Sequence, residues 1–414
     1  MQSKIQKGAL TRTFKKPAFA GRSSGSRGRF PVRGGNRSGG GRGRGVSTSI
    51  HPSKFVNKAV ITETVEQFVP EHKFADFLID ERLKANIIEK GYVDPTPIQD
   101  RAIPHILKGE DIVGIANTGT GKTAAFLIPL IHKVLSNPKE NILIMCPTRE
   151  LALQIEDELK GFIKGMGLYS VSCVGGAPIG SQIRQLRYRN EFVIGTPGRL
   201  KDLIERKVLN LSFFKTVVLD EADRMLDMGF INDMKFMMAM MPKDRHTLFF
   251  SATLSREIEM LIKDFLKNPV SISVKTQDTS KNVDQDVVRV NRGENKLDVL
   301  HSMLIQPDFS KVLIFGRTKH GVEKLTTLLQ GRGFKAESIH GDKNQSARQR
   351  ALKTFKDDKA QVLVATDVAA RGLDISGVSH VINFDIPATY EDYVHRIGRT
   401  GRAGKKGKAF TFID

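Results

Sequence analysis

The sequence predicts an α/β fold in which a disordered basic tail precedes two parallel-sheet domains. Three observations predict it. The length of 414 residues suits two or three domains. From about residue 74, short apolar runs alternate with longer helical stretches, the rhythm of repeated βα units. A glycine- and arginine-rich segment, which has little to bury, comes before that point.

The tail is the electrostatic outlier of the chain. Residues 1–62 contain 14 Lys and Arg and no acidic residue, whereas residues 63–414 contain 51 basic and 45 acidic residues. Residues 21–45 hold ten glycines and seven arginines, so we expect residues 1–62 to be disordered. The charge favours a polyanion such as a nucleic acid as partner. A solubilising linker and a transit peptide are the alternatives, although the glycine density does not favour the amphipathic helix of the latter.

The apolar runs define two domains. In the first, expected at 63–274, they predict strands at 111–116, 141–146, 170–174, 192–195, 216–220 and 247–251. A polar segment at 275–285 predicts a linker. In the second domain, expected at 286–414, the runs predict strands at 287–290, 312–315, 336–340, 362–366, 380–383 and 409–413.

Composition also excludes some classes of protein. No apolar run reaches the length of a membrane span. Cys146 and Cys173 have neither Cys-x-x-Cys spacing nor a neighbouring histidine cluster, so neither a disulfide framework nor a zinc site is indicated. We expect a monomeric protein of the reducing cytoplasm.

A phosphate-binding loop is predicted between an apolar strand and an apolar helix. Glycines let backbone N–H groups surround phosphates, Lys122 supplies positive charge, and the Thr123 hydroxyl can ligate magnesium. A Gly-Lys-Thr turn in an ordinary glycine-rich loop is the alternative, and the flanking strand and helix argue against it. The expected nucleotide-binding residues of this loop are Ala116, Asn117, Thr118, Gly119, Thr120, Gly121, Lys122 and Thr123.

Two adjacent carboxylates follow the apolar run at 216–219. Asp220 can hold magnesium through water, and Glu221 can orient and deprotonate the water that attacks the γ-phosphate. An acidic helix N-terminus, stabilised by the helix dipole, is the alternative.

Residues 74–414 resemble the DEAD-box RNA helicases motif by motif. The matching segments read GYVDPTPIQ at 91–99, PTREL at 147–151, TPGR at 196–199, DEAD at 220–223, SAT at 251–253, ATDVAARGLD at 365–374 and HRIGRTGR at 395–402. The resemblance implies two tandem RecA-like domains that bind ATP and Mg²⁺ between them. It also implies that ATP hydrolysis is coupled to RNA binding without sequence preference, and to local unwinding or RNP remodelling.

The resemblance also implies individual roles around ATP. Gln99 would recognise the adenine edge and Phe74 would pack on the base; alternatively, Gln99 caps a helix and Phe74 is a core residue. Arg399 and Arg402 would be arginine fingers that stabilise charge on the γ-phosphate, with a solvated basic helix as the alternative. Two further residues would approach the ribose and phosphates from the second domain: Gly372 and Asp374.

The RNA-binding residues implied by the resemblance suit contact with the backbone rather than the bases. In the first domain they are Pro147, Thr148, Arg149, Gly175, Gly176, Thr196, Gly198 and Arg199. In the second domain they are Arg317, Thr318, His340, Gly341, Gln345, Arg348, Thr366 and Asp367. Ordinary turn chemistry or helix capping is the alternative for each. Ser251 and Thr253 would couple hydrolysis to strand separation, or else form a simple Ser/Thr turn.

Two other functions are compatible with parts of this pattern. An ATP-gated RNA clamp with little unwinding would carry the same motifs, and a regulatory protein could control either activity. A DNA helicase or another phosphate-loop ATPase fits the order of the motifs less well. Asp414 ends the chain directly after the last predicted strand, where the family generally continues with a helix, so we expect either a trimmed second domain or a truncated sequence.

Overall fold

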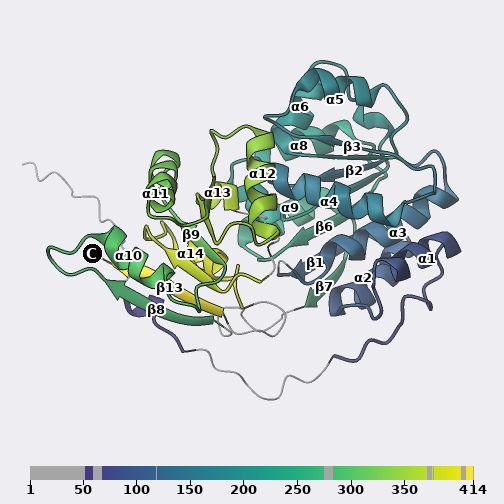
Figure 1. Ribbon diagram of the computed structural model, residues 1–414. Coiled ribbons are helices and arrows are strands. Elements are labelled where there is room, and N and C mark those ends of the chain that lie inside the picture. Colours follow the sequence, from purple (N-terminus) through teal and green to yellow (C-terminus); the bar gives the residue numbers. More distant parts are fainter. Residues whose placement is uncertain are drawn as a thin grey trace, which may run out of the picture. The chain divides into compact units, whose positions relative to one another are not determined.

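The computed structural model describes residues 52–58, 68–117, 119–274, 283–370, 375, 377–401 and 407–413. These residues form two β-sheets, each with helices on both faces (Figure 1). Within the described part of the chain, all neighbouring strands of both sheets run parallel. The predicted α/β class with two parallel-sheet domains is confirmed.

The first sheet has the strand order β3-β4-β2-β5-β6-β1-β7. Its strands are β1 (Ile112–Ala116), β2 (Ile142–Met145), β3 (Ser170–Cys173), β4 (Phe192–Gly195), β5 (Thr216–Leu219), β6 (His246–Ser251) and β7 (Val270–Val274). The central strands are continuous apolar runs because helices cover both faces. Neighbouring β6 residues therefore enter different cores: Phe250 packs on one face and Phe249 on the other.

Two groups of helices cover this sheet. The core on one face includes side chains of α1 (Glu81–Glu89), α2 (Pro97–Leu107), α3 (Lys122–Ser136) and α4 (Arg149–Phe162). The other face packs against α5 (Ile179–Leu186), α6 (Pro197–Glu205), the 3-10 helix η2 (Leu211–Phe213), α7 (Ala222–Asp227), α8 (Ile231–Met240) and α9 (Arg256–Phe265).

The second sheet has the order β10-β11-β9-β12-β13-β8. Its strands are β8 (Val283–Arg289), β9 (Val312–Phe315), β10 (Ala336–Ile339), β11 (Val362–Ala365), β12 (His380–Asn383) and β13 (Gly407–Ile413). The core on one face includes α10 (Lys296–Leu304) and α11 (Lys319–Gly331). The opposite core includes α12 (Gln345–Lys356), α13 (Asp367–Ala370) and α14 (Tyr390–Ile397).

Two strands differ from the expected ones. Strand β7 pairs with β1 at the edge of the first sheet and was not predicted, because serines alternate with its apolar residues. Strand β8 begins at Val283, inside the segment predicted as a linker, because Asp284, Gln285 and Asp286 hide its strand character in the sequence. Residues 275–282 lie outside the described residues.

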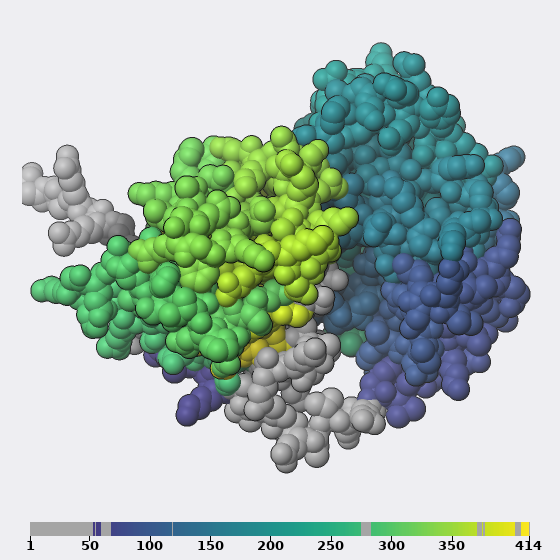
Figure 2. Space-filling view, viewed as in Figure 1, coloured from purple at the N-terminus to yellow at the C-terminus, as the bar shows by residue number. Residues whose placement is uncertain are grey.

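Part of the predicted disordered tail is folded, which corrects that expectation. Residues Pro52–Phe55 form a 3-10 helix, η1, and the Phe55 side chain is completely buried in a core of the second domain. Asn57 and Gln285 of β8 form an antiparallel bridge, with N···O distances of 3.0 and 2.7 Å. Figure 2 shows the purple atoms of this segment against the green atoms of the second domain. The rest of the expected tail, 1–51 and 59–62, and the following residues 63–67 lie outside the described residues.

A search for membrane-spanning helices among the described residues finds none that is both long and apolar enough.

Candidate nucleotide and RNA site

The phosphate loop lies between β1 and α3. Gly119 and Gly121 have φ values of 84° and 92°, the left-handed region that glycine adopts at little cost. A Cβ on Gly121 would stand 2.5 Å from the Gln99 amide nitrogen, so this position needs glycine for space as well. The Lys122 ammonium is buried and donates to the Ala116 carbonyl at 2.9 Å. The loop thus holds the positive charge of Lys122 at the first turn of α3. Thr118 of the predicted loop lies outside the described residues.

Gln99 is buried beside this loop. Its carbonyl oxygen accepts from the Thr96 N–H at 2.9 Å, as in a helix cap, and its amide donates to the Gly121 carbonyl at 3.0 Å. Phe74 is also buried, and its ring packs edge-on against Phe77 and Tyr92 in the first domain's core. Gln99 thus caps a helix and Phe74 is a core residue, as the alternative interpretations predict. Contact of either residue with adenine stays a prediction.

The two adjacent carboxylates stand at the carboxyl end of β5, and both are buried. Burial raises the pKa of Asp220 to about 6; the Lys122 charge opposes this shift and the Glu221 charge adds to it. Glu221 has a left-handed backbone, with φ 51° and ψ 50°, which is strained for a residue with a side chain. Its carboxylate accepts from Arg224 at 3.1 Å. The turn therefore holds Glu221 in an orientation that an ordinary helix start would not give.

Asp223 joins this turn to the Ser-Ala-Thr turn after β6. One oxygen of its carboxylate accepts from the backbone N–H groups of Ala252 and Thr253, both at 3.0 Å, and from the Thr253 hydroxyl at 3.2 Å. The Ser251 hydroxyl donates to the Thr253 carbonyl at 2.8 Å. Because β5, β6 and β1 are neighbouring parallel strands, the two turns and the phosphate loop lie side by side at the carboxyl ends of these strands.

Three arginines of the predicted RNA-binding set are close enough to affect one another. Burial lowers the pKa of Arg149; the charge of Arg348 lowers it further, that of Glu150 opposes the shift, and that of Arg199 adds to it. A Cβ on Gly176 would collide with the Arg149 guanidinium, and one on Gly175 would stand 3.3 Å from it. The two glycines therefore leave room for a guanidinium that has other positive charges as neighbours.

The other predicted residues of the first domain lie at turns that follow strands. The Thr148 hydroxyl caps α4 by accepting from Leu151 N–H at 3.3 Å. Pro147 precedes this cap, and Thr196 and Gly198 lie at the start of α6. Arg199 of α6 donates to the Gln182 side chain at 3.0 Å and to the Ala177 carbonyl at 3.2 Å.

In the second domain, several predicted residues lie between β10 and α12. Arg348 donates to Glu150 at 2.7 Å and to the His340 carbonyl, which precedes Gly341, at 3.4 Å. His340 Nε2 lies 2.9 Å from the Glu323 carboxylate. His340 Nδ1 and both polar atoms of the Gln345 amide are buried without a hydrogen-bond partner in the described part of the chain. Buried polar atoms normally have a hydrogen-bond partner, so these donors and acceptors have hydrogen-bonding capacity that the described residues do not use.

The remaining residues surround α11 and α14. The Arg317 N–H donates to Asp385 at 2.7 Å, and the Thr318 hydroxyl caps α11 by accepting from Gly321 N–H at 3.0 Å. Thr366 and Asp367 lie at the start of α13, and both Asp367 oxygens accept from Arg396, at 2.5 and 2.8 Å.

Arg399 follows α14 and is buried. It lines a small cavity with Phe315, Asp367, Ala370, Asp392, His395 and Arg396. Its predicted companion Arg402, and Gly372 and Asp374, lie outside the described residues.

Comparison with known proteins identifies the family. The model of the DEAD/DEAH box helicase family matches residues 96–261, and that of the helicase conserved C-terminal domain matches residues 295–404. The ATP-dependent RNA helicase CshA of Listeria monocytogenes is 46% identical over 344 residues, which are 82% of this chain and 66% of that protein. The chain belongs to the DEAD-box ATP-dependent RNA helicase family.

Solved structures agree with this membership. Saccharomyces cerevisiae Dbp5 bound to RNA and ADP BeF3 is 30% identical, with 82% of this chain and 89% of that chain covered and a TM-score of 0.72. Mss116p bound to single-stranded RNA and AMP-PNP is 31% identical, with 81% and 72% covered and a TM-score of 0.73. The two domains of this DEAD-box protein are therefore RecA-like, as the resemblance implies.

Sequence reasoning missed two groups of this DEAD-box site. The motif that contains Asp223 does not indicate its task, which is to hold the Ser-Ala-Thr turn. Nor does the sequence indicate that Glu150 pairs with Arg348, 198 positions later in the chain. Each of these carboxylates is distinguished by its burial, which only the structure shows.

Proposed function

We propose that this chain is an RNA-dependent ATPase that couples ATP binding and hydrolysis between its two domains to RNA binding without sequence preference and to local duplex unwinding or RNP remodelling. The observation that carries the proposal is the meeting of three turns at one sheet edge, where Asp223 ties the carboxylate turn to the Ser-Ala-Thr turn. Chemistry at Glu221 and movement at Thr253 are thereby mechanically connected.

The side chains have complementary tasks in this mechanism. Lys122 is held inside the loop by one carbonyl, so it can turn its charge to the outer phosphates of ATP. Glu221 accepts the proton of the attacking water while its backbone strain and its bond to Arg224 keep the carboxylate oriented. Arg399 and Arg402 stabilise the charge that develops on the γ-phosphate.

Thr123 and Asp220 fit a magnesium ion. Asp220 is buried, and its raised pKa reflects a carboxylate that lacks solvent. Magnesium in nucleotide sites uses one or two protein oxygens and completes its shell with phosphates and water, which these two residues allow. When bound, the ion would neutralise charge on the phosphates.

RNA contact is proposed for the arginine cluster and the unsatisfied polar atoms. Arg149, Arg199 and Arg348 gather positive charge; Glu150 pairs with Arg348, and a phosphate would neutralise the charge that remains. The buried, partnerless atoms of His340 and Gln345 suit phosphate oxygens and 2′-hydroxyls. Dbp5 and Mss116p are bound to RNA in the structures named above, which supports this assignment.

The test is the variant Glu221→Gln. We expect it to bind ATP and RNA as the parent does, to hydrolyse ATP at least 100-fold more slowly, in line with the loss of a catalytic base, and to retain RNA. ATP turnover at the parental rate would refute the catalytic role. Duplex separation by the parent distinguishes an unwinding enzyme from an ATP-gated clamp, which would retain RNA without separating strands.

The basic tail is proposed to add RNA affinity. Deleting residues 1–51, which keeps the docked segment, should leave the maximal ATPase rate near the parental value. Apparent affinity for single-stranded RNA should fall, and its dependence on salt should become shallower because fewer counterions are released. Equal affinities and equal salt slopes would show that the tail is only a linker.

Both cysteines are buried free thiols, which supports a reducing compartment such as the cytoplasm.

A further inference from the structure

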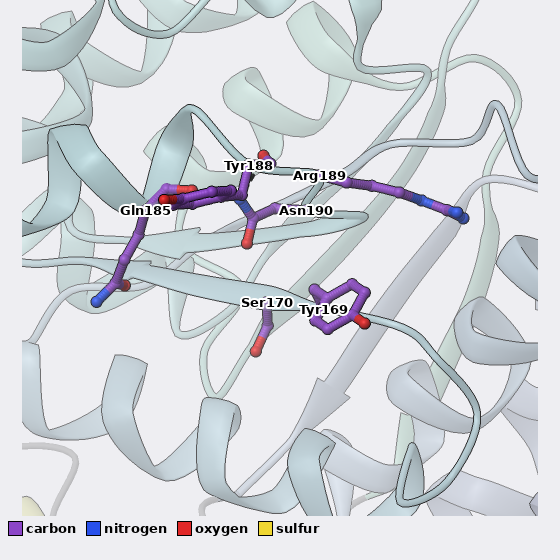
Figure 3. Close-up of a pocket in the computed structure, with 6 residues that line it drawn as sticks. All are labelled: Tyr169, Ser170, Gln185, Tyr188, Arg189 and Asn190. Carbon is purple, nitrogen blue, oxygen red and sulfur yellow. Dashed lines mark hydrogen bonds between the residues drawn. The ribbon is translucent and has the colours of Figure 1, made fainter.

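A surface cavity of about 460 Å³ lies on the first domain, away from the turns described above. It is lined by Tyr169, Ser170, Gln185, Tyr188, Arg189 and Asn190 (Figure 3). Tyr169 and Ser170 lie where β3 begins, and Arg189 and Asn190 lie just before β4. The cavity is therefore at the amino ends of these parallel strands, whereas Gly175, Gly176 and Thr196 follow their carboxyl ends.

Two aromatic rings border this cavity and are open to solvent. Tyr169 is 56% exposed and Tyr188 is 72% exposed. Figure 3 shows Tyr188 and Asn190 on one side of the cavity and Tyr169 and Ser170 on the other. A planar aromatic ligand could bury a ring face here, and burial of an aromatic ring is strongly favourable.

The backbone beneath both rings is fixed by hydrogen bonds. The Asn190 amide donates to the carbonyls of Gln185 and Tyr188, both at 2.9 Å. The Tyr169 N–H donates to the Glu191 carboxylate at 2.8 Å, and the Tyr169 carbonyl accepts from the Glu191 N–H at 3.1 Å. The rings are thus presented on ordered backbone, so binding would cost little backbone entropy.

The segment that lines the cavity is basic. Arg189 is one of the lining residues, and Arg184 and Arg187 are exposed within five residues of it in the sequence. Glu191 is buried, and its carboxylate pairs with Arg189 as well as with the Tyr169 N–H. Glu156, whose carboxylate lies 3.5 Å from the Ser170 hydroxyl, pairs with Lys160 at 3.2 Å. Arg184 and Arg187, on the same segment as Arg189, are therefore the side chains that would supply positive charge for phosphates.

We propose that this cavity is an accessory site for an unpaired nucleobase of single-stranded RNA. The base stacks on Tyr188 or Tyr169, the Gln185 amide and the Asn190 amide oxygen meet its polar edge, and Arg184 and Arg187 meet the adjacent phosphates. Aromatic platforms beside basic side chains are the features with which proteins hold single strands without sequence preference. An apolar peptide would not need the arginines, and a membrane surface would not need a cavity.

The cavity is within reach of an RNA that already occupies the arginine cluster. Helix α5 runs from Ile179, just after Gly176, to Leu186, just before Tyr188, and eight helical residues span about 12 Å. A strand a few nucleotides longer than the main site can therefore follow α5 to the cavity. The proposal predicts an affinity gain that depends on RNA length.

The experiment compares Tyr188→Ala and Tyr169→Ala with the matched control Tyr188→Phe, which keeps the ring. Affinity is measured for a short single-stranded RNA that fills only the main site and for one extended at either end. Loss of one stacked base should weaken binding of the extended RNA about 5- to 100-fold in one or both alanine variants. Tyr188→Phe should bind like the parent. Affinity for the short RNA and for ATP should be the same in every variant, because neither ligand reaches the cavity. The temperature of thermal unfolding should also stay the same, because these side chains are exposed.

Two results would overturn the proposal. One is equal affinity of the parent and both alanine variants for the extended RNA. The other concerns AMP. If AMP changes the spectra of Tyr169 and Tyr188 in the parent while the extended RNA does not, the cavity binds a free nucleotide and not RNA. Ultraviolet crosslinking of the extended RNA to the peptide that contains Tyr188, competed by unlabelled RNA and not by AMP, is the expected outcome.

Discussion

Phe55 anchors a short N-terminal segment to the second domain, so its replacement tests whether this segment belongs to that domain's fold. The ring is completely buried, and its centroid lies 4.8 Å from that of Tyr393 on α14. Tyr393 in turn donates from its hydroxyl to the Gln285 side chain at 2.9 Å. Because Arg396 and Arg399 follow Tyr393 on and just after the same helix, the segment supports the helix that carries the predicted arginine finger.

The cost of Phe55→Ala can be estimated from these contacts. Truncation of a buried phenylalanine costs about 3–5 kcal/mol. The aromatic pair with Tyr393 accounts for about 0.5–1.5 kcal/mol of that loss. Undocking of the whole segment would remove two backbone hydrogen bonds with Gln285 as well, each worth about 1 kcal/mol. For a domain of this size we expect the unfolding midpoint of the second domain to fall by roughly 10–20 °C.

Calorimetry of the full chain measures this effect, with the unfolding of the two domains followed separately. The matched control is Val56→Ala, one position further along the same segment, where the side chain is 52% exposed and the change should stay within about 0.5 kcal/mol. A peptide that spans residues 50–60 should restore part of the lost stability when added to a chain that begins after residue 58. If Phe55→Ala unfolds at the parental temperature, the segment does not stabilise the second domain.

Four further predictions concern single side chains. Lys122→Ala should abolish ATP binding in a fluorescent-nucleotide titration, since it removes the charge held at the phosphate loop; retained affinity would contradict that role. Asp223→Asn should keep ATP binding but uncouple hydrolysis from unwinding, seen as a fall of at least 10-fold in strands separated per ATP. Arg399→Ala should lower RNA-stimulated ATPase about 1,000-fold or more without changing the affinity of the whole chain for ATP; an equal loss of that affinity would show that the arginine binds ATP and does not act mainly on the reaction. Burial, aided by the charge of Lys408, lowers the pKa of His380 to about 4, so its proton uptake in the unfolded chain reduces stability as pH falls from about 6.5 to 4; unfolding of His380→Phe should depend less on pH in that window.

The alternation of apolar runs and helical stretches predicted the two parallel sheets. This worked because strands covered on both faces are apolar at every position, as in Ile142–Met145, and the sequence displays that property directly. The phosphate loop was equally readable, since glycines at 119 and 121 meet a backbone demand that few other residues satisfy.

The elements that were missed are those whose stability depends on distant partners. Strand β7 forms because β1 offers it a free edge, and β8 begins early because β13 pairs with its polar residues. Phe55 lies between Lys54 and Lys58 in a polar stretch that follows the glycine- and arginine-rich segment, so the sequence there predicts disorder. Only the hydrophobic site between β8 and α14 gives its ring a place to be buried.

The sequence alone determined which residues can do chemistry, because a motif specifies side chains and local backbone shape. It did not determine which of those side chains touch, because the pairs are remote: Asp223 meets Thr253 30 positions later, and Glu150 meets Arg348 198 positions later. Nor did it show that Tyr169 and Tyr188 border one cavity, since their exposure and separation depend on how β3 and α5 pack. The order of strands in a sheet decides contacts within one domain, such as that of Asp223 with Thr253, whereas the contact of Glu150 with Arg348 joins α4 of the first domain to α12 of the second. Local residue patterns encode neither.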